Sequence, residues 1–335
     1  MMDRVEFRWL WPAVCLALLA LSPPLAQAAD RQVILILGAP GNESYDEAFE
    51  AMALAWEKEG FRAPDLATER VRTREELTQT LGKWRGRGMP LEETWIVFLG
   101  HGTDDGKTAK LNLLGEDISA EDLGSLLEDW PGPLCFVHTG SASGRFASIL
   151  GKDQPQRVII TATQDAGEVY VPRWGTYLAE AWGDAQADLD QDQAVSLLEA
   201  AIVATKRVGD FYEGERRLAT EHAVLEDNGD GKTTRLDRFE GLEFEARKDE
   251  NPDGEEARRW FLRRSPLDQS LTLPERQRRD VLEAELAALK ASREAMTEED
   301  FFQQAEAILL QLGGIYRDRE EVDSEGSVSL DPGES

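Results

Sequence analysis

The chain has 335 residues, and its 65 acidic side chains outnumber its 37 basic ones to give a formal net charge of -28. Hydrophobic residues make up 41% of the sequence, enough for a sizeable core, so a wholly disordered chain is excluded. Nucleic acids and anionic membranes attract positive charge, so neither is expected as a partner. The length fits one large domain or a domain with an appendage.

Residues 1–28 predict a secretory signal peptide. Arg4 and Arg8 precede the apolar run 9–21, and Ala26-Gln27-Ala28 has the small-x-small pattern of a cleavage site. The alternative, an uncleaved anchor, is disfavoured because the run is short for a bilayer span. We expect an exported protein, periplasmic or secreted. The mature chain is expected to have no apolar run long enough to span a membrane. It retains a single cysteine, Cys135, which excludes an intrachain disulfide.

Apolar runs and helical stripes alternate from residue 31 to about 210. This alternation predicts an α/β sandwich with a mainly parallel sheet in a domain of residues 29–240. In such a sheet the loops after the strand ends carry the chemistry. Strands are predicted at 33–37, 95–99, 108–114, 134–137 and 158–161, and helices at 44–59, 73–85, 143–151, 174–183 and 194–208, with a further helix beginning at Ser119.

The rest of the chain predicts a helical appendage. Pro274 and Thr297 are good helix starts, and apolar side chains recur at helical spacing after each of them. The resulting hairpin either packs against its own domain or serves as an interaction arm. The predicted segments are a polar connector at 241–264, a helical hairpin at 265–318 with helices at 274–294 and 297–317, and a disordered acidic tail at 319–335.

Two predicted strand ends carry candidate catalytic residues. His101 lies in a Gly-His-Gly turn after the strand 95–99, and Ser141 follows the strand 134–137. A hydroxyl and a histidine at neighbouring strand ends can meet, with the histidine as general base and the N–H groups around Gly102 and Ser141 binding an oxyanion. The alternative is that Ser141 or Ser143 caps the following helix.

The order of these motifs resembles the caspase-like fold of legumain-type cysteine peptidases. His101 matches the family histidine, and Gly140-Ser141-Ala142-Ser143-Gly144 matches the family's Ala-Cys-x-Ser-Gly, with Ser141 in place of the nucleophilic cysteine. The resemblance covers about residues 31–210 and implies a caspase-like three-layer sandwich. Asp46-Glu47 stand where legumains carry an Arg-His pair after the first-loop tyrosine, here Tyr45, which reverses the charge.

These departures favour a pseudo-peptidase that binds a protein or peptide. A serine hydroxyl needs a well-placed base, whereas a thiol supplies some thiolate unaided. The alternative is an active hydrolase in which Ser141 attacks and His101 is the general base. Cys135 lies within a predicted strand and is expected to be buried and inert. His138 and His222, the latter in a helix-like segment, are expected to be structural, and the three histidines form no zinc motif.

Two acidic loops, 188–199 and 226–237, follow the spacing of EF-hand calcium sites. Gln193 occupies the turn position where the motif prefers glycine, whereas the second loop keeps Gly231 there. Six to eight oxygens suit Ca²⁺, so a structural calcium ion is expected, and a solvated turn that binds no ion is the alternative. The predicted ligands are Asp188, Asp190, Asp192, the carbonyl of Ala194, Ser196 and Glu199 in the first loop, and Glu226, Asn228, Asp230, the carbonyl of Lys232, Thr234 and Asp237 in the second.

Overall fold

A seven-stranded sheet forms the centre of the molecule. The computed structural model describes residues 31–59, 61, 66–87, 92–244 and 250–326, and the predicted signal peptide lies outside them. Strands β2, β1, β3, β7 and β8 are neighbours in that order and run parallel to one another. Strand β9 runs antiparallel to β8, and β10 runs antiparallel to β9. In spatial order the strands are β10 (Thr234–Arg235), β9 (Val224–Glu226), β8 (Arg157–Thr161), β7 (Leu134–His138), β3 (Glu93–Leu99), β1 (Arg31–Leu37) and β2 (Leu66–Val71).

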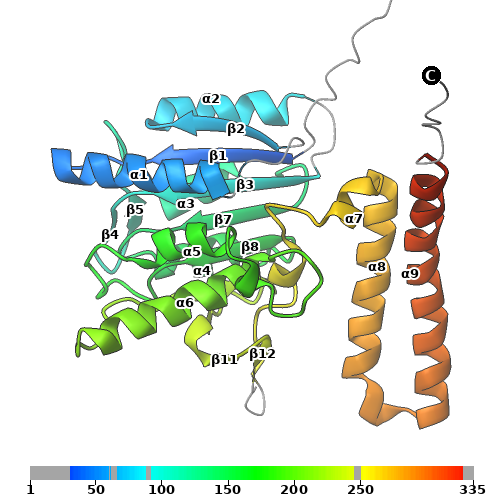
Figure 1. The fold of residues 1–335 in the computed structure, drawn as a ribbon. Coiled ribbons are helices and arrows are strands. Elements are labelled where there is room, and N and C mark those ends of the chain that lie inside the picture. The colour runs from blue at the N-terminus through cyan, green and yellow to red at the C-terminus, as the bar shows by residue number, and fades with distance from the viewer. Residues whose placement is uncertain (1–30, 60, 62–65, 88–91, 245–249, 327–335) are drawn as a thin grey trace, which may run out of the picture.

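Helices cover both faces of this sheet (Figure 1). Every residue of β1 and β3 is buried, including the polar residues with which each strand begins, as expected for strands between two helical layers. Alternate side chains of β1 therefore enter two separate cores: Val33 and Leu35 pack with one helical layer, and Ile34 and Ile36 with the other. The first layer contains α1 (Glu43–Glu59), α5 (Trp174–Ala181) and α6 (Leu197–Gly214), and the second contains α2 (Arg74–Arg85), α3 (Ala120–Leu126) and α4 (Gly144–Gly151).

Short elements complete the α/β domain. Three small strands form a separate antiparallel sheet after β3, and a two-stranded ribbon follows β10. These elements are β4 (Gly102–Asp104), β5 (Ala109–Leu111), β6 (Ile118–Ser119), β11 (Phe239–Glu240), β12 (Glu243–Phe244), and the 3-10 turns η1 (Ala185–Ala187), η2 (Leu236–Arg238) and η3 (Ala257–Arg259).

The C-terminal part is a pair of long helices beside the α/β domain (Figure 1). The pair follows α7 (Pro266–Ser270) and consists of α8 (Leu273–Ala291) and α9 (Glu298–Gly326), separated by η4 (Arg293–Ala295). Thr272 and Glu275 form a capping box at the start of α8, with Pro274 in its first turn. Arg276 contacts Glu92, just before β3, at 2.9 Å. The helices therefore lie near the amino ends of the strands.

Several structural features differ from the sequence predictions. Strands β2, β4, β6, β9, β10, β11 and β12 are additional. The segment 241–264 is more than a connector, because Trp260 packs edge-on against Trp95 at 5.2 Å and Leu262 is fully buried. His222 lies in irregular backbone before β9 instead of a helix. Helix α9 continues to Gly326, so the first part of the expected tail is helical, and residues 327–335 lie outside the described part.

Within the described residues, none of the helices combines the length and the apolar character that a membrane crossing needs.

Candidate functional site

The loops after β3 and β7 meet at the carboxyl edge of the sheet. A Cβ atom on Gly102 would lie only 2.4 Å from the carbonyl oxygen of Ser141, and one on Gly140 would lie 2.0 Å from the carbonyl oxygen of Gly100. Only glycine permits backbones to approach this closely. The topology therefore brings the two predicted catalytic loops together, and the glycines of both loops make the contact possible.

Ser141 is buried in this contact. Its side chain is 3% exposed, and its hydroxyl donates a hydrogen bond to the carbonyl oxygen of Gly102 at 3.3 Å. Ser141 and His101 share no hydrogen bond in the structure, which describes both residues. A serine nucleophile needs its hydroxyl hydrogen-bonded to a base, so this arrangement leaves Ser141 unactivated.

His101 is half-buried among aromatic side chains. Its ring meets Tyr45 edge-on at 4.6 Å and Phe49 at 5.2 Å, both from α1. Burial lowers the pKa of His101, which favours the neutral imidazole. A neutral imidazole is able to accept a proton, but in the described residues no carboxylate hydrogen-bonds to this ring to orient it, as one does in a catalytic triad.

Cys135 and His138 on β7 belong to the core. Cys135 is fully buried, and burial raises the pKa of its thiol, so the expectation of an inert cysteine is met. His138 is also fully buried, which lowers its pKa to about 3. Its Nδ1 accepts a hydrogen bond from the Gly140 N–H at 3.0 Å, and its ring packs against Phe98 and Phe146. Both residues are therefore structural.

Ser143 connects two strand ends. It precedes α4 at the N-cap position, but its side chain makes no capping hydrogen bond. Its hydroxyl instead lies 2.7 Å from the hydroxyl of Thr163, just after β8, and accepts a hydrogen bond from the Thr163 N–H at 3.1 Å. Ser143 thus fixes the Ser141 loop to the next loop along the sheet edge.

A carboxylate–histidine pair that the sequence analysis missed lies at the same edge. Glu168, in the loop after β8, accepts hydrogen bonds from the N–H groups of Gln164 at 2.9 Å and His222 at 3.1 Å, and its carboxylate contacts Nδ1 of the His222 ring. The carbonyl of Glu168 accepts a hydrogen bond from the Ala142 N–H at 2.9 Å. The loop therefore touches both the Ser141 loop and the segment before β9.

Glu221, which precedes His222 in the sequence, holds the far end of the loop that follows β8. Its carboxylate accepts hydrogen bonds from the N–H groups of Arg173 at 2.8 Å and Trp174 at 3.0 Å, at the start of α5. Between these two attachments, Val169, Tyr170 and Val171 are 62%, 68% and 38% exposed. Three consecutive exposed apolar side chains on an anchored loop are typical of a contact surface for a partner.

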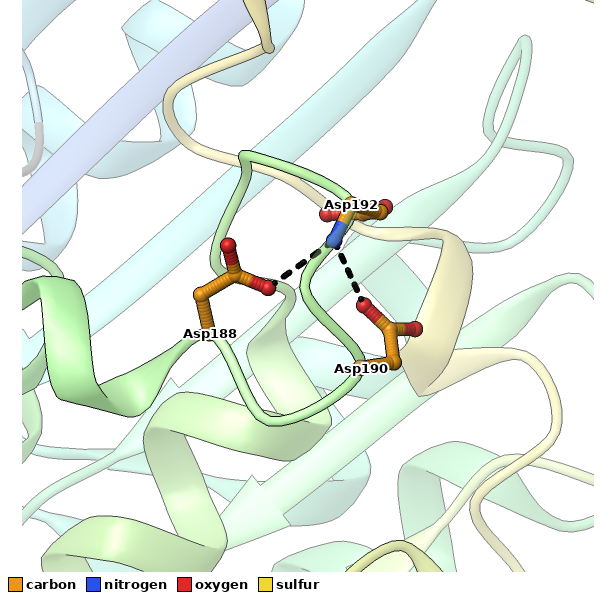
Figure 2. Close-up of side chains that lie close together, drawn as sticks. All are labelled: Asp188, Asp190 and Asp192. Atoms are coloured by element: carbon orange, nitrogen blue, oxygen red, sulfur yellow. Dashed lines mark hydrogen bonds between the residues drawn. The ribbon is translucent and has the colours of Figure 1, made fainter.

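The first acidic loop gathers three carboxylates. Oxygens of Asp188, Asp190 and Asp192 lie within 4.8 Å of one another, and Figure 2 shows the Asp192 N–H between the carboxylates of the other two. That N–H donates to Asp188 at 3.1 Å and to Asp190 at 3.2 Å. Burial, followed by the charges of its acidic neighbours, raises the pKa of Asp192 to about 6. The group would be stabilised by a cation.

Glu199 closes this loop. One carboxylate oxygen accepts the N–H groups of Leu189 at 2.7 Å and Asp190 at 3.2 Å, and the other accepts the N–H and hydroxyl of Ser196, both at 2.8 Å. The carboxylate is thus engaged by the loop and by the first turn of α6. Gln193 adopts a φ of +73°, the left-handed conformation for which the motif prefers glycine.

The second acidic loop joins β9 to β10 and does not assemble its predicted ligands. Asp237 pairs with Arg235, and the Thr234 hydroxyl donates to Asp253 at 2.8 Å. Glu226 is fully buried, one of its oxygens accepts the Gly231 N–H at 3.0 Å, and the other has no partner among the described residues. The remaining predicted ligands are in its turn, where Asn228 accepts the N–H of Asp230 at 3.0 Å and Asp230 accepts that of Lys232 at 2.8 Å.

Comparison with known proteins finds matches among solved structures, among them a protein from Geobacter sulfurreducens and a Drosophila caspase. No family model matches the chain, and no curated protein matches it. Protein GSU0716 from Geobacter sulfurreducens is 13% identical with a TM-score of 0.36, covering 53% of this chain and 89% of its own. The Drosophila initiator caspase Dronc is 10% identical with a TM-score of 0.42, covering 62% of this chain and 84% of its own. The predicted α/β class is confirmed by the mainly parallel seven-stranded sheet, its two helical layers and the C-terminal helix pair.

Proposed function

We propose that the α/β domain is a caspase-like pseudo-peptidase that binds a protein or peptide at the carboxyl edge of its sheet. The observation that carries this proposal is the buried Ser141 hydroxyl, which donates to the Gly102 carbonyl instead of to a base. The motif order around His101 and Ser141 supports the caspase-like assignment. The competing function is a hydrolase that uses the same two residues, and it requires Ser141 to break its present hydrogen bond.

The binding surface is the anchored loop after β8. Glu168 and Glu221 fix its two ends, and the three exposed apolar side chains at 169–171 lie between them. Tyr45, beside His101, is 36% exposed and adds an aromatic surface at the same edge. A preformed loop binds with a smaller loss of conformational entropy than a loop that becomes ordered on binding. An extended peptide with apolar side chains is the partner that fits this surface.

A peptide-display experiment tests the binding proposal. The exported chain would be screened against displayed random peptides, and the enriched peptides titrated with the purified protein. We expect binding that weakens at least about tenfold, near 1.4 kcal/mol, in a Val169→Ser/Tyr170→Ser double variant. Leu218→Ser is the matched control, because Leu218 is 90% exposed and belongs to none of these loops. Equal affinity for the double variant would contradict the proposal.

Calcium bracing of the first acidic loop is the second part of the proposal. Three carboxylates close together fit a hard cation, and the pKa of Asp192, raised first by burial and further by its acidic neighbours, fits a group whose charge a cation would stabilise. Asp188, Asp190 and Asp192 would hold the ion, with the Ala194 carbonyl as a further oxygen in the same loop, whereas the Ser196 hydroxyl is engaged by Glu199. Glu199 would keep the loop closed. The second loop is left out of the proposal because Thr234 and Asp237 are engaged elsewhere.

Calorimetric titration with calcium tests this part. We expect one binding event that disappears in Asp190→Asn, with a Kd in the range of about 10⁻⁴ to 10⁻³ M that is typical of extracellular calcium modules. Asp165→Asn, a change of an exposed acid in another loop, is the control. Calcium would be available to such a site in an exported protein, and export is itself proposed from the sequence of the first 28 residues. Equal heats for wild type and Asp190→Asn would contradict the site.

A further inference from the structure

The outer helix of the C-terminal pair carries an exposed apolar stripe. Helix α9 lies on the far side of α8 from the α/β domain (Figure 1). Phe302, Leu309 and Leu310 on this helix are 56%, 53% and 64% exposed. Side chains three, four or seven residues apart share one face of a helix, and these leucines belong to such a series. The α9 stripe consists of six exposed residues: Phe302, Glu306, Leu309, Leu310, Gly313 and Arg317.

Charge is sparse along this part of α9. Between residues 301 and 316 the only charged side chain is that of Glu306, whereas the whole chain is 30% charged with a net charge of -28. Two copies of so acidic a protein repel each other over most of their surface, so they approach most easily through a face with few acids. Gly313 adds room on this face, because a Cβ atom there would meet nothing within 4 Å and a second helix is able to come close to its bare backbone.

The two charges of the α9 stripe have opposite signs. In the part of the chain that the structure describes, the side chains of Glu306 and Arg317 make neither an ion pair nor a hydrogen bond. The six residues are also arranged symmetrically about a point between Leu309 and Leu310. Phe302 lies as far before this point as Arg317 lies after it, and the same holds for Glu306 and Gly313. A surface with this symmetry is complementary to itself across a two-fold axis.

We propose that the α9 stripe binds the α9 stripe of a second copy of this chain, in antiparallel orientation. The leucines of the two copies then pack together at the two-fold axis. Arg317 of each copy lies at the level of Phe302 of the other and one helical turn from Glu306, so its guanidinium contacts an aromatic ring and a carboxylate. A parallel pair would instead place Glu306 against Glu306 and Arg317 against Arg317, and like charges oppose such a contact.

Sedimentation velocity of the exported chain, over a concentration series up to about 100 µM, tests the dimer. We expect the wild type to dimerise, and a Leu309→Gln/Leu310→Gln double variant to have a Kd at least about tenfold higher. Leu54→Gln is the matched control, because Leu54 is 60% exposed on α1 and lies outside the stripe. Circular dichroism checks that these exposed substitutions leave the fold intact. A wild type that stays monomeric, or a double variant with the wild-type Kd, would overturn the proposal.

Exchange of the two charges tests the antiparallel orientation. Glu306→Arg and Arg317→Glu each place like charges together, and each is expected to raise the Kd about threefold or more. The combined variant restores opposite charges in exchanged positions, so its Kd should return toward that of the wild type. A combined variant that dimerises more weakly than either single variant would exclude this pairing.

A cysteine near the proposed axis gives a second measurement. Leu310→Cys should form a disulfide with its own copy on mild oxidation, because position 310 lies beside the two-fold axis. Leu54→Cys, also exposed but on α1, is the control, and Cys135 is buried and does not contribute. Equal amounts of covalent dimer from the two variants would contradict the proposal. The stripe shares no residue with the peptide surface or the acidic loop, so these results are independent of the proposed function.

Discussion

The hydroxyl of Ser141 donates a hydrogen bond to the carbonyl oxygen of Gly102, and this contact joins the loop after β7 to the loop after β3. The two backbones approach each other because residue 102 has no side chain. The hydroxyl of Ser141, the candidate nucleophile, is therefore engaged in a hydrogen bond between the two loops.

Gly102→Ala tests how tightly these loops are packed. A methyl group there would meet the Ser141 carbonyl oxygen at 2.4 Å, and such overpacking typically costs about 1–3 kcal/mol. We expect the free energy of unfolding, measured by urea denaturation, to fall by that amount. Gly82→Ala in the interior of α2 is the control, since its Cβ would meet nothing within 4 Å and alanine favours a helix by about 0.5–1 kcal/mol. A neutral effect at position 102 would mean that the loops are not in contact.

Asp192→Asn should stabilise the calcium-free protein near neutral pH. The folded-state pKa of about 6 lies above the ordinary value of 3.8, so the folded protein binds more protons between these values and loses stability as the pH rises through this window. Solvent screening of this half-exposed group limits the gain from its removal to about 1 kcal/mol at pH 7.5.

The sign of the Asp192 effect should reverse when calcium is present. Thermal unfolding in chelator and in millimolar calcium measures both conditions: the variant should have the higher Tm in chelator and the lower Tm in calcium. A variant that is more stable than wild type in both buffers would show that the loop binds no ion.

Glu226 predicts a second pH dependence. Burial, with smaller contributions from the charges of Asp227 and Asp230, raises its pKa from 4.5 to about 7. The folded protein therefore loses stability as the pH rises from about 4.5 to 7, and Glu226→Gln should remove that loss. We expect the variant to be more stable by about 2 kcal/mol at pH 8 and to match the wild type near pH 4. Parallel pH profiles of the two proteins would rule out a buried, protonated Glu226.

The Glu168–His222 contact should protect the loop that carries the apolar side chains. Glu168→Gln replaces the carboxylate by a neutral amide. This weakens the contact with the His222 ring and the hydrogen bonds that the carboxylate accepts from the N–H groups of Gln164 and His222. We expect faster hydrogen exchange of the amides at 169–171 in this variant, with little change in the strands. Glu128→Gln, the same change at an exposed acid outside this loop, serves as the control. Unchanged exchange would mean that the loop is held by other contacts.

The sequence predicted four of the five parallel strands because segments such as 33–37 of β1 and 95–99 of β3 are continuously apolar, as expected between two helical layers. It missed the fifth, β2, half of whose residues are polar and most of which are partly exposed. It missed β9 and β10, whose three and two residues are too short for a periodic pattern. The Glu168–His222 contact joins residues 54 positions apart, and no local pattern predicts such a pair.

The sequence analysis also did not predict the burial of Trp260 against Trp95. The surrounding segment 241–264 is charged overall, so its composition indicated a connector, while its few apolar residues complete the core. Spacing identified the acidic group at 188–192 but not the engagement of Glu199, which depends on the helix start at Ser196.

The most direct test of the central claim is cleavage of a peptide pool in the presence of calcium, followed by mass spectrometry, with wild type and Ser141→Ala side by side. A pseudo-peptidase predicts identical peptide patterns for the two proteins, with no new termini relative to a sample without protein. New termini that appear with the wild type and vanish with Ser141→Ala would contradict it and make Ser141 a working nucleophile.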